Sequence, residues 1–162
     1  MPDPTAFAVL VRTLEPQLRA NAAASFAGVA RSGDGTLDIY VVGIDSAGVS
    51  TIVARAQAAL GAHVPVRLIT GQQHSLAELN ALQSQVTAAQ PRLKADGIVL
   101  TEWAVNIRAN KVHIGILNLD DATRTRLGQE FGADRIELVP GGYYRVAVDD
   151  RACRSWQWAS GI

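Results

Sequence analysis

The chain has 162 residues, of which 48% are hydrophobic, so it is long enough to bury a core as one domain or as two small lobes. Fifteen Lys and Arg residues balance fifteen Asp and Glu residues, and this neutral charge implies no basic face for nucleic acid or for an anionic membrane surface, so we expect neither as a partner. The single cysteine, Cys153, excludes an internal disulfide and a zinc site rich in thiolates.

No stretch approaches the roughly 20 apolar residues that span a bilayer, and the first residues lack the pattern of a secretion signal. We therefore expect a cytoplasmic protein, or a secreted one if the chain is a trimmed fragment. Residues 1–24 are predicted to form an N-terminal helical segment, because apolar residues recur there at helical spacing. These residues are Phe7, Leu10, Val11, Leu14 and Leu18. Pro16 is expected to break or restart the helix.

Residues 25–72 are predicted to form a first ββαβ unit. Two β-rich stretches, 25–31 and 36–43, flank the turn sequence SGDG and predict a hairpin. An amphipathic helix follows, and Gly61 is placed to end it in a left-handed cap. Its apolar stripe consists of Val49, Ile52, Val53, Ala56 and Leu60. Residues 64–70 predict the third strand of the unit.

A connecting helix is predicted for residues 73–91, and its start is specified by Ser75 and Glu78. These two residues form the S-x-x-E pattern of a capping box, in which each side chain accepts a hydrogen bond from a backbone amide of the other residue. Pro91 is expected to mark the end of this helix.

Residues 92–140 repeat the order strand, turn, strand, helix, strand, and a tail follows at 141–162. A constant shift places Leu37 on Val112 and Ile39 on Ile114, so the pattern of the first unit recurs. We expect an α+β fold of two ββαβ units, each a three-stranded, mostly antiparallel sheet with helices on one face. Such sheets leave an edge free for the strands of another chain.

The ionisable residues show no pattern typical of a catalytic, cofactor or metal site. His63, His74 and His113 belong to different predicted elements and lack the spacing of metal ligands. Glu102 and Trp103 alternate to opposite faces of a strand, so the tryptophan offers no apolar wall that would raise the pKa of the carboxyl. We expect no catalytic residue, cofactor or metal, although a site assembled from distant loops would leave no local motif.

Three segments together resemble the pro-regions of secreted chymotrypsin-like bacterial serine proteases, the α-lytic protease and streptogrisin family. The segments are SFAGVARSGDGTLDIYVVG, HSLAELNAL and EWAVNIRANKVHIGI, in the order and at the spacing of that family. The positions that carry the resemblance are Phe26, Gly28, His74, Ser75, Leu76, Trp103, Val105, Asn110 and Val112. The family's Trp-x-Val-Asp ends here in Asn106, which must then supply any bond that fixes the turn.

The resemblance implies a non-catalytic module that binds a chymotrypsin-like serine protease as a folding chaperone or inhibitor. In that family a protease hairpin extends the sheet of the second unit, and the tail of the pro-region lies in the protease cleft like a substrate. Strand addition supplies backbone hydrogen bonds for such a complex. The implied contact residues are Ile136, Leu138, Val139, Pro140, Tyr143 and Tyr144.

The tail faintly resembles the start of the mature protease, but the segments with that family's catalytic histidine and serine are absent from this sequence. By the same resemblance, a disulfide partner of Cys153 would belong to the absent segments. A second prediction therefore stays open, namely a cytoplasmic binding or oligomerisation domain of this fold with a different partner. Tyr143, Tyr144, Trp156 and Trp158 favour contact with a partner or a second copy, or they cover the chain's own sheet.

Overall fold

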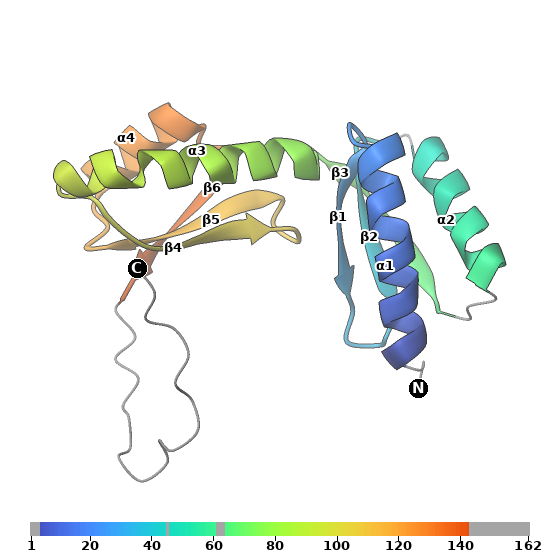
Figure 1. The fold of residues 1–162 in the computed structure, drawn as a ribbon. Coiled ribbons are helices and arrows are strands. Elements are labelled where there is room, and N and C mark those ends of the chain that lie inside the picture. Colours follow the sequence, from blue (N-terminus) through green and yellow to red (C-terminus); the bar gives the residue numbers. More distant parts are fainter. Residues whose placement is uncertain (1–3, 45, 61–63, 143–162) are drawn as a thin grey trace, which may run out of the picture.

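The structure is a computed structural model that describes residues 4–44, 46–60 and 64–142. Within these residues the helices and strands form two lobes, one from each half of the chain (Figure 1). The helices are α1 (Pro4–Asn21), α2 (Ala47–Leu60), α3 (Leu76–Ala95) and α4 (Asp121–Phe131). The strands are β1 (Phe26–Arg31), β2 (Leu37–Val42), β3 (Val66–Gln72), β4 (Val99–Asn106), β5 (Lys111–Leu117) and β6 (Ile136–Gly141).

The order of the elements confirms the predicted α+β fold, with two ββαβ units after an N-terminal helix. One sheet has the strand order β1-β2-β3 and the other β4-β5-β6. In each sheet the first pair is antiparallel and the second pair is parallel. Both sheets are therefore mixed and not mostly antiparallel as predicted, because the crossover helices α2 and α4 return the chain to the neighbouring position in the same direction.

The N-terminal lobe, from α1 to β3, is built around its own core. Its two helices lie side by side on one face of the first sheet (Figure 1). The buried residues are Leu10, Leu14, Leu18, Phe26, Leu37, Ile39, Val41, Val49, Val53, Ala56, Val64 and Leu76. Leu76 comes from the start of α3, so this core already contacts the second half of the chain.

The C-terminal lobe, from α3 to β6, has a second core. Both of its helices lie on the same face of the second sheet, and the described residues place no helix on the opposite face (Figure 1). The buried residues are Leu79, Leu82, Val86, Leu93, Ile98, Leu100, Val112, Ile114, Ile116, Leu127, Phe131 and Ile136. Trp103 packs against this core, and its Nε1 donates to Thr87 Oγ1 on α3 at 2.8 Å. The tryptophan therefore belongs to the packing of helix on sheet.

Both prolines that were expected to interrupt helices lie inside them, so these two predictions are wrong. Pro16 is within α1 and Pro91 within α3. A proline inside a helix costs about 3 kcal/mol. Leu14 and Leu18 flank Pro16 and are fully buried, and Leu93 follows Pro91 and is also fully buried. Each such side chain contributes about 2 kcal/mol on burial, which favours a continuous helix.

Capping side chains fix the starts of α3 and α4, and the cap of α3 is the predicted one. Ser75 and Glu78 form the complete capping box at the start of α3. At the start of α4, the side chain of Asp120 accepts a hydrogen bond from the Thr123 amide at 2.7 Å, and Gly132 follows the helix with a φ of 90°. Gly61, the predicted cap of α2, lies outside the described residues.

The capping box makes the stability of the fold depend on pH. Hydrogen bonds from the Ser75 amide and hydroxyl lower the pKa of Glu78 from its ordinary value of 4.5. A carboxylate whose pKa is lower in the folded chain stabilises the fold above its unfolded pKa, and this contribution is lost as the pH falls through the folded value. We expect the thermal midpoint of the wild type to fall more steeply between about pH 5 and pH 3 than that of Glu78→Gln. Parallel profiles would contradict this assignment.

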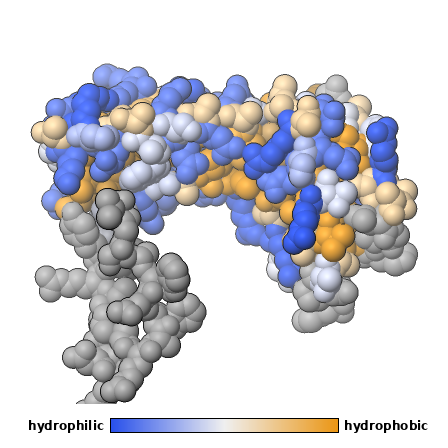
Figure 2. All heavy atoms as spheres, viewed as in Figure 1, coloured by the Kyte–Doolittle hydropathy of each residue, from blue (hydrophilic) through white to orange (hydrophobic). Residues whose placement is uncertain are grey.

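The two lobes meet through apolar contacts as well as polar ones. Figure 2 shows hydrophilic residues over most of the outer surface of the helices, and hydrophobic residues in the middle of the view, where the lobes meet. Val105, near the end of β4, packs against both cores. The region around the β4–β5 turn therefore joins the two halves of the molecule.

Candidate functional site

Asn110, in the β4–β5 turn, binds the backbone that connects the lobes. Its Oδ1 accepts hydrogen bonds from the amides of Gln73 and His74 at 2.9 and 2.8 Å, and its Nδ2 donates to the carbonyl of His74 at 2.8 Å. The residue is 7% exposed and has a φ of 55°, a conformation that asparagine adopts more easily than most residues. One side chain therefore ties the second hairpin to the residues just before α3.

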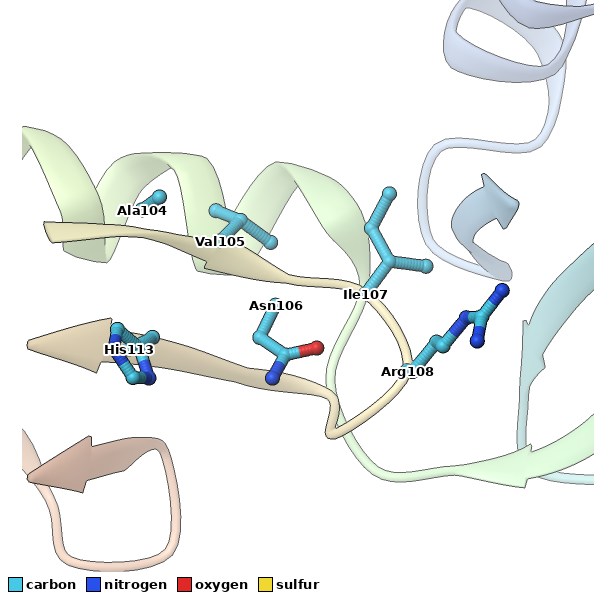
Figure 3. A pocket seen from close by; sticks show the side chains of 6 residues that line it. All are labelled: Ala104, Val105, Asn106, Ile107, Arg108 and His113. Carbon is cyan, nitrogen blue, oxygen red and sulfur yellow. The ribbon is translucent and has the colours of Figure 1, made fainter. Parts of the chain in front are cut away.

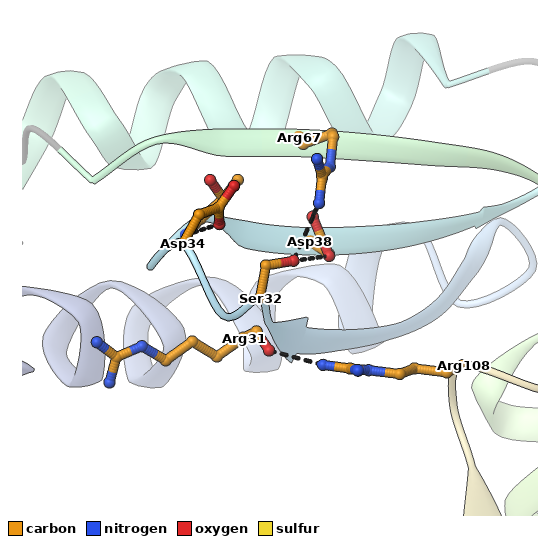
Figure 4. Close-up of polar contacts among 7 residues, drawn as sticks. Arg31, Ser32, Asp34, Asp38, Arg67 and Arg108 are labelled. Atoms are coloured by element: carbon orange, nitrogen blue, oxygen red, sulfur yellow. Dashed lines mark hydrogen bonds and ion pairs between the residues drawn. The ribbon is translucent and has the colours of Figure 1, made fainter.

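Two further contacts from the same turn reach the N-terminal lobe. A Cβ built on Gly28 would lie 2.7 Å from Cγ2 of Ile107, so the absence of a side chain there makes room for the isoleucine. Arg108 Nη2 donates to the carbonyl of Arg31 at 2.8 Å (Figure 4). We call this set of contacts, made by Ile107, Arg108 and Asn110, the lobe junction.

Asn106 supplies a bond within the turn, as the family resemblance implied. The Oδ1 of Asn106 accepts a hydrogen bond from the Ala109 amide at 3.2 Å. Two of the positions that carry the family resemblance, Gly28 and Asn110, lie in the lobe junction, and Val105 lies next to it. These positions thus have a structural role, which is to set how the two sheets are held against each other.

A shallow hollow of about 390 Å³ lies beside the junction, on the open face of the second sheet (Figure 3). It is lined by Ala104, Val105, Asn106, Ile107, Arg108 and His113. The lining is mostly apolar, and its ionisable groups are the guanidinium of Arg108 and the imidazole of His113. The hollow is wide open to solvent, and it offers a contact surface more than an enclosed pocket.

His113 stands between two carboxylates on the open face of the second sheet. Its Nδ1 lies 3.2 Å from Glu137 Oε2 on β6, and its Nε2 lies 3.5 Å from Glu102 Oε1 on β4. This histidine lies on the solvent side of the strand, with 30% of its side chain exposed. Among the described residues, no group of three or more His, Cys, Asp or Glu side chains is arranged to hold a metal ion.

His74 lies next to the start of α3. Its side chain is 15% exposed, and Nε2 lies 3.4 Å from Asp134 Oδ2 without the geometry of a hydrogen bond. The backbone of His74 is held by Asn110, whereas its imidazole packs beside the helix start. His63, the third histidine, lies outside the described residues.

β6 is an edge strand of the second sheet, and its outward backbone groups can be assigned from one hydrogen bond. The Val112 amide donates to the carbonyl of Arg135 at 2.8 Å, so that carbonyl faces β5. Backbone groups of alternate residues point to the same side of a strand. Ile136, Leu138 and Pro140 therefore direct their backbone groups away from β5, toward the side where no described strand pairs. We call these groups the β6 edge.

The side chains predicted to contact a partner fall into different environments. Ile136 is buried in the second core and Leu138 packs against that core, so these two residues offer only backbone groups at the edge. Val139 is half-buried and Pro140 is exposed. Tyr143 and Tyr144 lie outside the described residues. Arg124 on α4 donates to the carbonyl of Leu138 at 3.3 Å and thus occupies one group of the β6 edge.

A buried polar cluster in the N-terminal lobe was not anticipated from the sequence. Asp38 is 5% exposed; its carboxylate accepts hydrogen bonds from Ser32 and from Arg67, whose Nε lies 2.8 Å away (Figure 4). The cluster joins the β1–β2 hairpin to β3. Its only signal in the sequence is an aspartate within an apolar strand, because its arginine partner is 29 residues away.

The comparisons with known proteins add no assignment to this geometry. No protein-family model matches the chain, and no curated protein is significantly similar to it. No helix in the described part of the chain is both long and apolar enough to cross a membrane.

Proposed function

We propose that the chain is a non-catalytic module, similar to the pro-regions of secreted chymotrypsin-like proteases, that binds such a protease as a folding chaperone or inhibitor. Binding would use the β6 edge and the segment 143–162 that follows it. The proposal rests on the motif resemblance together with one structural observation, the edge of β6, along which no described strand pairs.

The β6 edge is suited to strand addition. Ile136 and Leu138 each present a backbone N–H and C=O outward, and a strand placed beside them would pair with all four groups. Pro140 presents only a carbonyl, because proline has no backbone N–H. An edge strand is the usual place for proline in a sheet. A partner strand would therefore be bound over a short, defined stretch, immediately before the chain leaves the sheet at Gly141.

The lobe junction supports the same proposal. A folding assistant must hold its contact surfaces in place before its partner is folded, since loss of freedom on binding weakens the complex. Asn110 and the contact between Gly28 and Ile107 join the two sheets through short, directional contacts. Two positions that carry the family resemblance, Gly28 and Asn110, thus lie in the lobe junction, where a folding assistant needs a rigid connection between its lobes.

The proposal is tested with a purified protease of the α-lytic protease and streptogrisin family. The unfolded protease is diluted into buffer with and without this chain, and recovered activity is followed over time; the folded protease is assayed for inhibition in parallel. We expect faster recovery or inhibition at micromolar chain concentrations. Neither effect at those concentrations would overturn the proposal.

The second candidate function is a binding or oligomerisation domain with another partner. The edge strands of the two sheets support this function as much as they support the first one. Light scattering on the whole chain and on a chain ending at Gly142 separates the two. Self-association that disappears with residues 143–162, together with no effect on the protease, would favour this second function.

A further inference from the structure

We propose that the β6 edge selects an antiparallel strand of another protein with a basic residue opposite Glu137, and that Glu137 prevents two copies of this chain from pairing there. This inference rests on the proposed function, since it names the chemistry of the partner strand. It follows from three features of β6, namely the direction of its backbone groups, the charge on its open face and the symmetry of self-pairing.

The backbone groups define the register of an added strand. In an antiparallel pair, residues that exchange two hydrogen bonds alternate with residues that exchange none. Ile136 and Leu138 have outward groups, so they take the hydrogen-bonded positions, and Glu137 between them takes the non-bonded one. At that position the two Cα atoms are only about 4.5 Å apart, and side chains directly opposite each other are in close contact.

The charge at this position is acidic. Glu137 projects from the open face of the sheet with 42% of its side chain exposed. The polar groups facing it are the His113 imidazole, at 3.2 Å, and the Asn106 amide, at 3.5 Å. Glu102 lies on the far side of His113 and adds a second carboxylate to the same face. A lysine or arginine opposite Glu137 is therefore favoured, and an acidic residue is disfavoured.

The helix side of the edge carries the opposite charge but does not block it. Arg124 donates to the Leu138 carbonyl at 3.3 Å from an exposed position on α4. An incoming amide must displace this guanidinium, whose side chain is free to turn toward solvent. Arg124 therefore acts as a cover for the edge, in the way that charged side chains protect exposed strands from unspecific pairing.

A second copy of the chain is a poor occupant of the same edge. If two β6 strands pair about a twofold axis and use all four outward groups, Ile136 of each copy lies opposite Leu138 of the other. Glu137 then lies directly opposite Glu137 at the closest approach of the two strands. Like charges at that position are destabilising. A register shifted toward the end of β6 pairs Ile136 with Pro140, which has no N–H, and a register shifted toward its start places Leu138 opposite Asp134, which lies in the turn before the strand.

The test uses two synthetic hairpins that differ in one residue. Their edge strands are Thr-Val-Lys-Val-Thr and Thr-Val-Glu-Val-Thr, and the amide signals of Ile136 and Leu138 are followed by NMR titration. We expect the lysine hairpin to bind about five- to ten-fold more tightly than the glutamate hairpin, with the order reversed in Glu137→Lys. Equal affinities, or shifts located elsewhere on the chain, would overturn the proposal.

Two matched variants check that the backbone carries the binding. Leu138→Pro removes the leucine side chain and the outward backbone N–H. Leu138→Ala also removes the leucine side chain, but it keeps the backbone N–H. We expect hairpin binding to be lost in the first and retained in the second. A wild-type dimer that dissociates on Leu138→Pro would contradict the claim that Glu137 prevents self-pairing.

The outcome is separable from that of the proposed function. Selective hairpin binding without any effect on the protease leaves the edge chemistry valid and removes the protease from consideration. Protease inhibition that is the same for the wild type and Leu138→Pro leaves the function standing and removes the β6 edge as its contact.

Discussion

Replacing Asn110 with alanine is expected to lower the free energy of unfolding by about 3 kcal/mol. The change removes three hydrogen bonds, leaves the amides of Gln73 and His74 without their acceptor, and forces alanine into a φ of 55°. Urea unfolding measures the loss. Because these bonds tie the second hairpin to the start of α3, hydrogen exchange at both amides should also accelerate.

Two other substitutions at this position separate the contributions. Asn110→Gly tolerates the backbone conformation but loses the side-chain bonds, and Asn110→Asp keeps an acceptor for both amides but loses the donor to the His74 carbonyl. We expect Asn110→Asp to be the mildest of the three. If alanine and wild type unfold at the same urea concentration, Asn110 does not hold the lobes together.

Gly28→Ala is expected to destabilise the fold by about 3 kcal/mol, for two reasons that add. Gly28 has a φ of 131°, in a region that residues with a side chain rarely adopt, and it lies at the bulge where the pairing of β1 with β2 shifts. In addition, the new methyl group would lie 2.7 Å from Ile107. Thermal or urea unfolding of the purified variant measures the effect.

The control for Gly28→Ala is a double-mutant cycle with Ile107→Ala. Truncation of the isoleucine removes the collision but not the backbone strain, so the double variant should be more stable than the sum of the two single effects predicts, by about 1 kcal/mol. Additive effects would mean that the close approach of Gly28 and Ile107 does not exist in solution, and the lobe junction would then lack its apolar contact.

Local patterns in the sequence predicted most of the elements to within a few residues. The hairpin around SGDG is observed as β1 and β2, and the helix predicted between the last two strands of the second unit is observed as α4. The strand expected at 64–70 is observed at 66–72. These predictions depend on neighbouring residues only, such as a cap three positions from its partner or an alternation of apolar side chains.

The wrong predictions share one cause, which is that packing overrode a local signal. Proline disfavours a helix through its effect on the backbone of the residues next to it. The fully buried leucines near Pro16 and Pro91, however, pack against residues that are far away in sequence, and this packing favours the helix. Packing between elements also places Trp103, whose indole lies against α3.

The candidate site was predictable only in part. The sequence placed a strand near 136 and a free sheet edge somewhere in the second unit. It did not show that Ile136 is buried, or that Glu137 shares the open face with His113 and Glu102. Which side of β6 is unpaired depends on strand order, and strand order is a property of the whole sheet.

By itself, the amino-acid sequence determined the order of strands and helices in the two ββαβ units, the capped start of α3 and the bond that Asn106 makes in the β4–β5 turn, because each depends on residues that are close in sequence. The tertiary structure alone decided that Asn110 binds residues 73 and 74, that Gly28 makes room for Ile107, and that Asp38 pairs with Arg67. These contacts join residues that are tens of positions apart, and their geometry exists only once both cores have formed.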